Sequence, residues 1–376
     1  MVKLDVCEAG SFIKLETQNK TYRFHAIWLR DNSLDGHTRD PINGQRLITL
    51  ADIPKDIRID RVSVEGEEIT CSFSTEGTVY RFPINWLIDH AYDKEKKHRD
   101  VSLPKNAVSW GKNYKLDVPS SKLSQLESNS TVLRGWLADI QRFGFAKVTG
   151  IDTEPEEIFR IVNLFGFVRE TNYGRLFEVR TEVKPVNLAY TGLGLQAHTD
   201  NPYRDPVPTI QVLSCLENSA EGGESMVVDG FAVAITLQEE DPEGFKCLSD
   251  FPARFAYEGS KDVSLHSKRP AIELGPDNEI LCIRFNSRSA APLIDIPFDL
   301  MESYYRAYKR LSELVDDPEN QVEFKLKAGE AFLVDNTRVL HSRKSFSGTG
   351  NRWLQGCYAD KDSLLSKLSS LEKTSE

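Results

Sequence analysis

The sequence predicts a mainly β protein with added helices, divided into a small N-terminal β domain and a larger C-terminal domain. Short segments rich in β-branched and aromatic residues, separated by turns, recur through most of the 376 residues. A stretch without hydrophobic periodicity precedes a change of pattern near residue 130. The composition, 40% hydrophobic and 28% charged, is that of an ordinary globular protein, and the length is sufficient for two domains.

The N-terminal β domain is expected over residues 1–95. Its predicted strands, separated by glycine and charged turns, are Ser11–Leu15, Thr21–Ala26, Arg58–Val64, Glu68–Phe73 and Thr78–Phe82. Residues 96–128 carry many Lys, Asp, Pro and Ser residues without periodicity, which indicates a linker.

The C-terminal domain, residues 129–376, is expected to begin with a helix. Leu133, Trp136, Leu137 and Ile140 form a helical stripe, and a strand over residues 145–148 follows it. Further helices are expected over 154–165, near 230–248, over 299–315 and over 362–373, with strands elsewhere from about 186 to 360. An all-β core with helices around it suggests a jelly-roll barrel, also called a double-stranded β-helix, although periodicity alone equally allows another β-sandwich.

Charge and composition exclude several classes of function. The net charge is −10 and the pI about 5.4, and no long Lys/Arg block supplies the basic face that nucleic-acid binding needs. No segment approaches the roughly 18 apolar residues of a membrane helix, and the N-terminus has no signal-peptide core. The six cysteines are scattered, as expected for reduced, mostly buried thiols. We therefore expect a cytoplasmic protein that binds neither nucleic acid nor membrane.

Two histidines and an aspartate form a candidate metal site. His198 and Asp200 stand two residues apart, so on a strand both side chains face the same side. Such a pair alone is as well explained by a surface histidine beside a solvated aspartate. His341, however, follows far along the chain on its own apolar strand. Two histidines and one carboxylate form the open-faced triad typical of iron(II) oxygenases.

An arginine accompanies this triad. Arg352, eleven residues after His341, opens the strand-like stretch Arg352–Tyr358. A guanidinium there offers a bidentate fork for a carboxylate. A surface salt bridge is the alternative, which the apolar neighbours disfavour. The His-x-Asp pair, the distant histidine and the arginine eleven residues after it together indicate this type of metal site far more specifically than any one of them alone.

This arrangement resembles the 2-oxoglutarate-dependent dioxygenases of the taurine dioxygenase superfamily, and within it the γ-butyrobetaine and trimethyllysine hydroxylase branch. The resemblance covers nearly the whole chain and rests on the stretches 28–32 (WLRDN), 187–190 (NLAY), 198–200 (HTD), 222–225 (GGES) with 228–230 (VDG), and 341–360. It implies a jelly-roll catalytic domain behind a smaller β domain, often in a homodimer, that uses Fe(II), 2-oxoglutarate and O₂.

The resemblance also implies roles for individual residues. Arg352 is expected to bind the distal carboxylate of 2-oxoglutarate, and Ser225 to assist it, unless Ser225 is only a turn residue. A box of aromatic rings would hold a trimethylammonium group by cation–π attraction. By resemblance the rings of the box are Tyr173, Phe177, Tyr190 and Tyr358, for each of which core packing is the alternative. Tyr358 lies six residues after Arg352, on the same face of one strand.

Zinc is not expected. Many relatives hold a structural zinc through cysteines just after the WLRDN motif, whereas this chain has residues 33–37 (SLDGH) there, without a cysteine. Zinc sites of that kind need thiolates.

The expected anion site differs from that of γ-butyrobetaine enzymes, which place neutral amides there. This chain keeps Asn187 but adds Arg288, and Asn201 and Tyr203 follow the aspartate ligand. An added guanidinium suits a tetrahedral, more highly charged oxyanion better than a monocarboxylate. We therefore expect a small zwitterion with a quaternary ammonium and a phosphonate, hydroxylated at the carbon bearing phosphorus.

Several alternatives stay open at this point. Arg30 is a further candidate phosphonate contact, with a structural role as its alternative, and Arg288 would alternatively pair with an acidic neighbour. γ-Butyrobetaine is the alternative substrate. A non-catalytic jelly-roll module that binds a zwitterion is an alternative of another class, and a metal-dependent hydrolase is weaker because no second metal cluster or nucleophile–base motif accompanies the triad.

Overall fold

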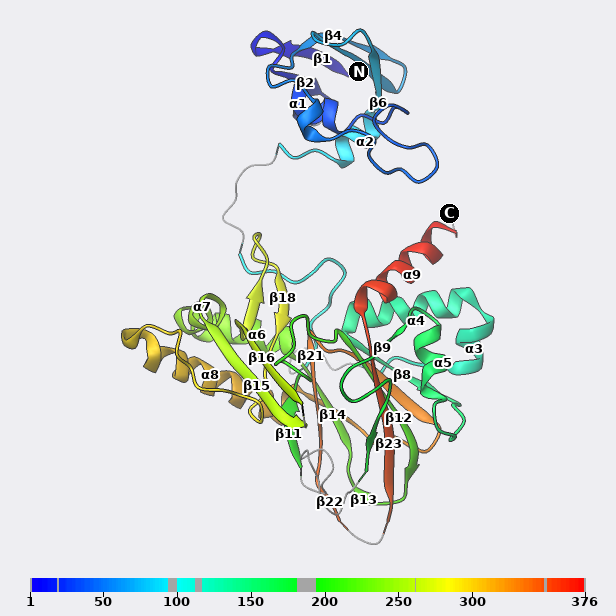
Figure 1. Ribbon diagram of the computed structural model, residues 1–376, viewed down its shortest axis with the longest axis vertical. Helices are drawn as coiled ribbons and strands as arrows, with labels where there is room; N and C mark the ends of the chain where they lie inside the picture. The colour runs from blue at the N-terminus through cyan, green and yellow to red at the C-terminus, as the bar shows by residue number, and fades with distance from the viewer. Residues whose placement is uncertain are drawn as a thin grey trace. The chain divides into compact units, whose positions relative to one another are not determined.

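The chain forms two compact units, Met1–His98 and Arg99–Glu376 (Figure 1). The structure is a computed structural model that describes residues 2–18, 20–93, 100–111, 117–180, 194–260, 262–347 and 350–374. Asn187 and Tyr190 lie outside the described residues.

The first unit contains two antiparallel three-stranded sheets, ordered β1-β2-β3 and β4-β5-β6. Its strands are β1 (Lys3–Cys7), β2 (Phe12–Glu16), β3 (Thr21–His25), β4 (Ile59–Glu65), β5 (Glu68–Phe73) and β6 (Val79–Pro83). All five predicted strands are present; β1 was missed. Its helices are α1 (Ala26–Asp31), which contains most of the WLRDN motif, and α2 (Ile84–Asp89). Side chains alternate between buried and exposed along β6, as the period of a half-buried strand requires.

The second unit has two main sheets. The larger is ordered β10-β23-β12-β20-β8-β7, with β9 paired to β23, and the smaller β11-β21-β14-β19. The larger sheet comprises β7 (Ser120–Lys122), β8 (Phe145–Thr149), β9 (Val168–Arg169), β10 (Phe177–Val179), β12 (Ile210–Asn218), β20 (Glu330–Asp335) and β23 (Arg352–Ala359). The smaller comprises β11 (Leu195–His198), β14 (Ser225–Asp229), β19 (Gln321–Phe324) and β21 (Val339–Arg343). This mainly β architecture confirms the predicted fold class, a jelly-roll core.

Three two-stranded pairs complete the strands of the described residues. They are β13 (Glu221–Gly222) with β22 (Phe346–Ser347), β15 (Pro252–Ser260) with β16 (Val263–Pro270), and β17 (Ile272–Leu274) with β18 (Ile280–Ile283).

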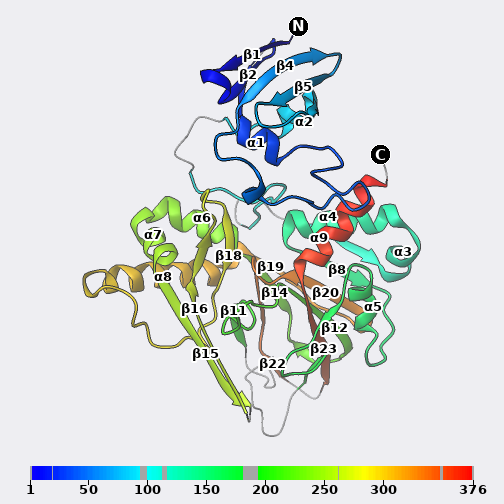
Figure 2. The ribbon, with the colours of Figure 1, turned by 45° about the horizontal axis from the view of Figure 1, so that its top comes forward.

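Helices flank the two sides of the second unit, as both ribbon views show (Figures 1 and 2). They are α3 (Leu123–Ser128), α4 (Ser130–Phe143), α5 (Ile158–Asn163), α6 (Gly230–Glu240), α7 (Pro242–Asp250), α8 (Met301–Asp316) and α9 (Lys361–Lys373). Helix α4 buries the predicted stripe against β8 and the larger sheet. The Asn129 side chain caps its N-terminus, and it ends at Gly144, whose φ of 80° is a conformation that glycine adopts without strain.

The stretch expected as a linker instead packs onto the second unit from residue 100 onward. Trp110 is buried, and its indole Nε1 donates to the carbonyl of Phe143 at 2.7 Å. Strand β7 pairs in parallel with β8, and α3 buries Leu123 and Leu126. Single aromatic anchors without periodicity leave no pattern in the sequence, so this stretch resembled a linker.

A buried ion pair joins this stretch to the core. The Arg338 guanidinium donates to both carboxylate oxygens of Asp229, at 2.9 and 2.8 Å, and also to the carbonyls of Val108 and Arg142. Asp229 in turn accepts from the backbone N–H of Trp110 at 3.1 Å. Arg338 lies in the turn between β20 and β21, so this network fixes the entry to the strand that carries His341.

Two further expectations concern cysteines and membranes. All six cysteines are free and five are buried, as predicted. Within the described part of the chain, every helix is too short or too polar to cross a membrane.

Candidate active site

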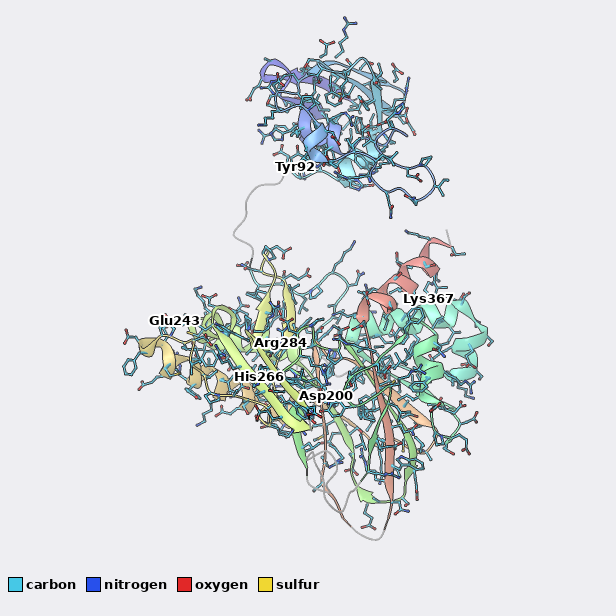
Figure 3. All side chains as sticks on the ribbon, viewed as in Figure 1. Tyr92, Asp200, Glu243, His266, Arg284 and Lys367 are labelled. Carbon is cyan, nitrogen blue, oxygen red and sulfur yellow. The ribbon has the colours of Figure 1, made fainter. Side chains whose placement is uncertain are left out.

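The three predicted metal ligands converge. One ligand atom from each of His198, Asp200 and His341 lies within 4.8 Å of the other two. His198 and His341 face each other directly across the pairing of β11 with β21. The two-residue spacing predicted that His198 and Asp200 lie on one strand. Strand β11 instead ends at His198, so Asp200 reaches the site from the turn beyond the strand. Asp200 lies in the middle of the second unit (Figure 3).

Both histidines present a neutral ring nitrogen to the site. The Nδ1 of His198 lies 2.8 Å from the carbonyl of Gln196. A carbonyl only accepts, so Nδ1 carries a proton. Nε2 lies 2.7 Å from the Arg288 guanidinium, which only donates, so Nε2 has a lone pair that a metal could take. Burial lowers the pKa of His341 to about 3, and the nearby His198 adds to the shift. His341 is therefore neutral at physiological pH, as a metal ligand must be.

Asp200 is ionised, with its two oxygens in different surroundings. Burial raises the pKa of its carboxyl, but His198, His341 and Arg288 outweigh burial and hold that pKa well below its usual range. Oδ1 lies 3.3 Å from Nε2 of His198 and 3.9 Å from Nε2 of His341. Oδ2 instead accepts hydrogen bonds from Gln211 and Tyr358.

A cavity of about 380 Å³ opens beside the triad. Residues of both main sheets line it, among them Leu213 and Arg352 from the larger and Ser225 and Arg343 from the smaller. Ser225 and Arg343 are direct partners across β14 and β21. Burial lowers the pKa of both arginines to about 10, and the positive charge of Arg352 contributes to the shift of Arg343. Both stay cationic at neutral pH, so this part of the cavity favours an anion.

Five aromatic rings form another wall of the cavity, and we call them the aromatic wall: Tyr173, Phe177, Tyr203, Tyr257 and Tyr358. Ring centroids lie 5.1 Å apart for Phe177 and Tyr358, and 4.9 Å apart for Tyr203 and Tyr257. Tyr173 bridges the two pairs, at 6.4 Å from Phe177 and 5.9 Å from Tyr257. Facing a cavity, such rings can bind a cation through their π faces.

Arg288 lies at the rim of the cavity and is an exposed residue. Its Nη2 donates to Nε2 of His198 at 2.7 Å. Its backbone is fixed by Asn286, whose Oδ1 accepts from the Arg288 N–H at 3.1 Å. Nε2 of His198 has one lone pair, so a metal and Arg288 are alternative partners for it. Arg288 therefore lies beside the metal ligands, and its charge helps to lower the pKa of Asp200.

Most of the predicted site residues line this one cavity: His198, Asp200, His341, Arg352, Ser225, Tyr173, Phe177, Asn201, Tyr203, Arg288 and Tyr358. Arg30 is placed in the first unit. There its guanidinium donates to the carboxylate of Glu76 and to Thr38, and lies over the ring of Tyr80. These contacts fit the structural role that the sequence left open for it.

Gln211, Tyr257 and Arg343 are among the cavity residues that the sequence did not point to. Gln211 and Tyr257 lie within ordinary strand patterns, and nothing local distinguishes them from packing residues. Arg343 carried a usable signal, since it stands two residues after His341 on the same strand and so faces the same side.

Comparison with known proteins identifies the family. Residues 103–358 match the family described as "Taurine catabolism dioxygenase TauD, TfdA family". The chain belongs to this family. It is 32% identical over 352 residues to a γ-butyrobetaine dioxygenase from Pseudomonas sp. (strain AK-1), covering 93% of this chain and 91% of the relative. It is 31% identical to the human mitochondrial trimethyllysine dioxygenase, covering 94% and 83%.

A solved structure supports the fold alone. An asparagine oxygenase in complex with Fe(II), 2S,3S-3-hydroxyasparagine and succinate superposes with a TM-score of 0.51 at 16% identity, covering 63% of this chain and 83% of that one.

The protein is thus a 2-oxoglutarate-dependent dioxygenase, and its triad fits Fe(II). Two neutral imidazoles and one ionised carboxylate are the donors that iron(II) takes in this class of enzyme. When bound, the iron supplies the activation of O₂, while the protein positions substrate and cosubstrate.

Proposed function

We propose that this dioxygenase hydroxylates 2-(trimethylammonio)ethylphosphonate at the carbon bearing phosphorus. In the balanced reaction, 2-oxoglutarate loses CO₂ to become succinate. One oxygen atom of O₂ enters succinate, and the other enters the substrate as a hydroxyl group. Family membership favours an enzyme over a non-catalytic binding module.

The aromatic wall supports a quaternary ammonium substrate. A trimethylammonium group cannot donate hydrogen bonds, so ring faces are the partners that discriminate it from a primary amine. The relatives named above carry trimethylammonium substrates in their names, γ-butyrobetaine and trimethyllysine. We infer the same class of substrate here, bound by Tyr173, Phe177 and Tyr358, with Tyr190 as a further expected ring and with Tyr203 and Tyr257 beside them in the aromatic wall.

The single observation that favours a phosphonate is the positive charge of the cavity. Its described lining includes three arginines, Arg288, Arg343 and Arg352, against two carboxylates, Asp200 and the exposed Glu258. Iron(II) adds two positive charges and 2-oxoglutarate cancels them, which leaves one positive charge. A zwitterion with a carboxylate is neutral and leaves that charge uncompensated. A phosphonate group, like a phosphate ester, carries about −1.5 to −2 near neutral pH, so the phosphonate zwitterion as a whole carries about −0.5 to −1 and compensates half or more of that charge.

Arg288 is the expected partner of the phosphonate. It lies at the rim beside His198, and its fork offers two parallel N–H donors to a tetrahedral oxyanion. Asn201 and the expected Asn187 would complete the polar end of the site. An oxyanion held there keeps the adjacent carbon near the metal, since only one bond separates carbon from phosphorus.

Arg288→Ala tests the substrate. We expect KM for the phosphonate to rise about 10- to 100-fold, the effect of losing a charged hydrogen bond of about 1.5–3 kcal/mol. Arg288→Lys keeps the positive charge but loses the bidentate fork, so its KM for the phosphonate should lie between the values of the native enzyme and Arg288→Ala. Succinate release and hydroxylated product are measured in parallel for the phosphonate and for γ-butyrobetaine. Preference for γ-butyrobetaine by the native enzyme, with Arg288→Ala harmless, would instead identify a γ-butyrobetaine hydroxylase that makes L-carnitine.

Arg352→Ala tests the cosubstrate site. Arg352 is expected to hold the distal carboxylate of 2-oxoglutarate, with Ser225 beside it. Its loss should raise KM for 2-oxoglutarate about 10- to 100-fold, while KM for the substrate changes little. Initial rates over a range of 2-oxoglutarate concentrations give both values. An unchanged KM for 2-oxoglutarate would place the carboxylate elsewhere, with Arg343 as the next candidate.

A further inference from the structure

We infer that Gln211 and Tyr358 are a pair of positioning residues that orient Asp200 as a one-oxygen ligand for iron. This inference rests on membership of the family and not on the identity of the substrate.

Both side chains donate to the same carboxylate oxygen. The Tyr358 hydroxyl donates to Oδ2 of Asp200 at 2.8 Å, and Nε2 of Gln211 donates to it at 2.5 Å. Oδ2 is thereby saturated by two donors. Oδ1, which faces Nε2 of His198 and of His341, is the oxygen left for the metal.

The sheet makes this pair rigid. Gln211 on β12 and Tyr358 on β23 are direct cross-strand partners in the interior of the larger sheet. Both are buried, with 2% and 4% of their surface exposed. Direct partners in a sheet project side by side on one face, so their two donors converge on one acceptor. Their positions are set by the backbone ladder and do not depend on a loop.

A third residue, Asn336, holds the backbone of Asp200. The Asn336 side chain accepts from the Asp200 N–H at 2.7 Å and donates to its carbonyl at 2.9 Å. It also donates to the carbonyl of Pro208 at 2.8 Å, which anchors it to the start of β12. Asp200 lies beyond the end of β11, so it lacks the support of a strand ladder. The contacts of Asn336, Gln211 and Tyr358 replace that support.

The ring and the hydroxyl group of Tyr358 consequently have different roles. Its ring packs on Phe177 in the aromatic wall, and its hydroxyl bonds the metal ligand. Removing the hydroxyl alone therefore separates metal positioning from substrate binding.

Iron affinity measured without substrate tests the inference. Anaerobic calorimetric titration with Fe(II) is expected to show a Kd about tenfold higher for Tyr358→Phe and for Gln211→Met than for the native protein, the lower end of what outer partners of metal ligands contribute. In the double variant the Kd for Fe(II) should rise by less than the product of the two single-variant factors, because both donors act on one oxygen.

Tyr173→Phe is the matched control. It also removes a hydroxyl from the aromatic wall, but that hydroxyl bonds Tyr203, at 3.0 Å, and not Asp200. Its Fe(II) affinity should stay within twofold of the native value. Thermal unfolding without metal monitors the fold of each variant. The inference is overturned if Tyr358→Phe and Gln211→Met bind Fe(II) as tightly as the native protein, or if Tyr173→Phe weakens binding equally.

Discussion

Replacing His341 with alanine is expected to reduce turnover by about three orders of magnitude or more and to lower the iron content of the purified protein. The triad supplies three protein ligands, and loss of one leaves a pair that cannot hold iron against solvent and buffer. Metal activation is worth several kcal/mol, and each 1.36 kcal/mol is a factor of about ten in rate. Iron is measured by elemental analysis and turnover by succinate release.

His37→Ala is the control for this prediction. His37 is exposed in the first unit, where its backbone N–H donates to the carboxylate of Asp35. Native iron content and activity are expected for it. A His341→Ala protein that retained full iron stoichiometry and activity would show that the metal binds elsewhere.

The second large effect concerns stability. Asp229→Ala leaves the Arg338 guanidinium buried without its carboxylate, and breaking a buried ion pair in this way costs about 3–5 kcal/mol. It also removes the side chain that caps α6 by accepting from the Phe231 N–H. Urea unfolding followed by circular dichroism should show a correspondingly lower free energy of unfolding.

An exposed pair provides the comparison. Arg310 and Glu240 form a surface ion pair between α8 and α6, and Glu240→Ala should cost less than about 1 kcal/mol. Equal losses for Asp229→Ala and Glu240→Ala would mean that the buried network contributes no more than surface charge.

The sequence predicted the metal ligands and Arg352 because their information is local. Each histidine lies in a short strand, and Arg352 opens β23, only eleven residues after His341. Gln211 could not be found in this way, since its task depends on a partner 147 residues away that becomes its neighbour only when β12 pairs with β23. The role of Gln211 follows from the pairing of the two strands and not from its residue type.

Hydrophobic pattern predicted the elements well where a long buried face repeats, and poorly elsewhere. The stripe of α4 and the alternation of β6 are of this kind. Helix α1 is only six residues long, too short for a period to show. The stretch from residue 100 to Trp110 attaches through one indole and a few backbone groups, so composition alone made it resemble a linker.

The attachment of Trp110 has a practical consequence for anyone who isolates the catalytic unit. A shortened protein that begins at α4 would remove Val108 and Trp110, whose backbone groups bond Arg338 and Asp229. The ion pair would then lose part of its shielding from water, beside the turn that leads to His341. A truncation boundary chosen by helix prediction should therefore be moved upstream, to residue 100 or earlier.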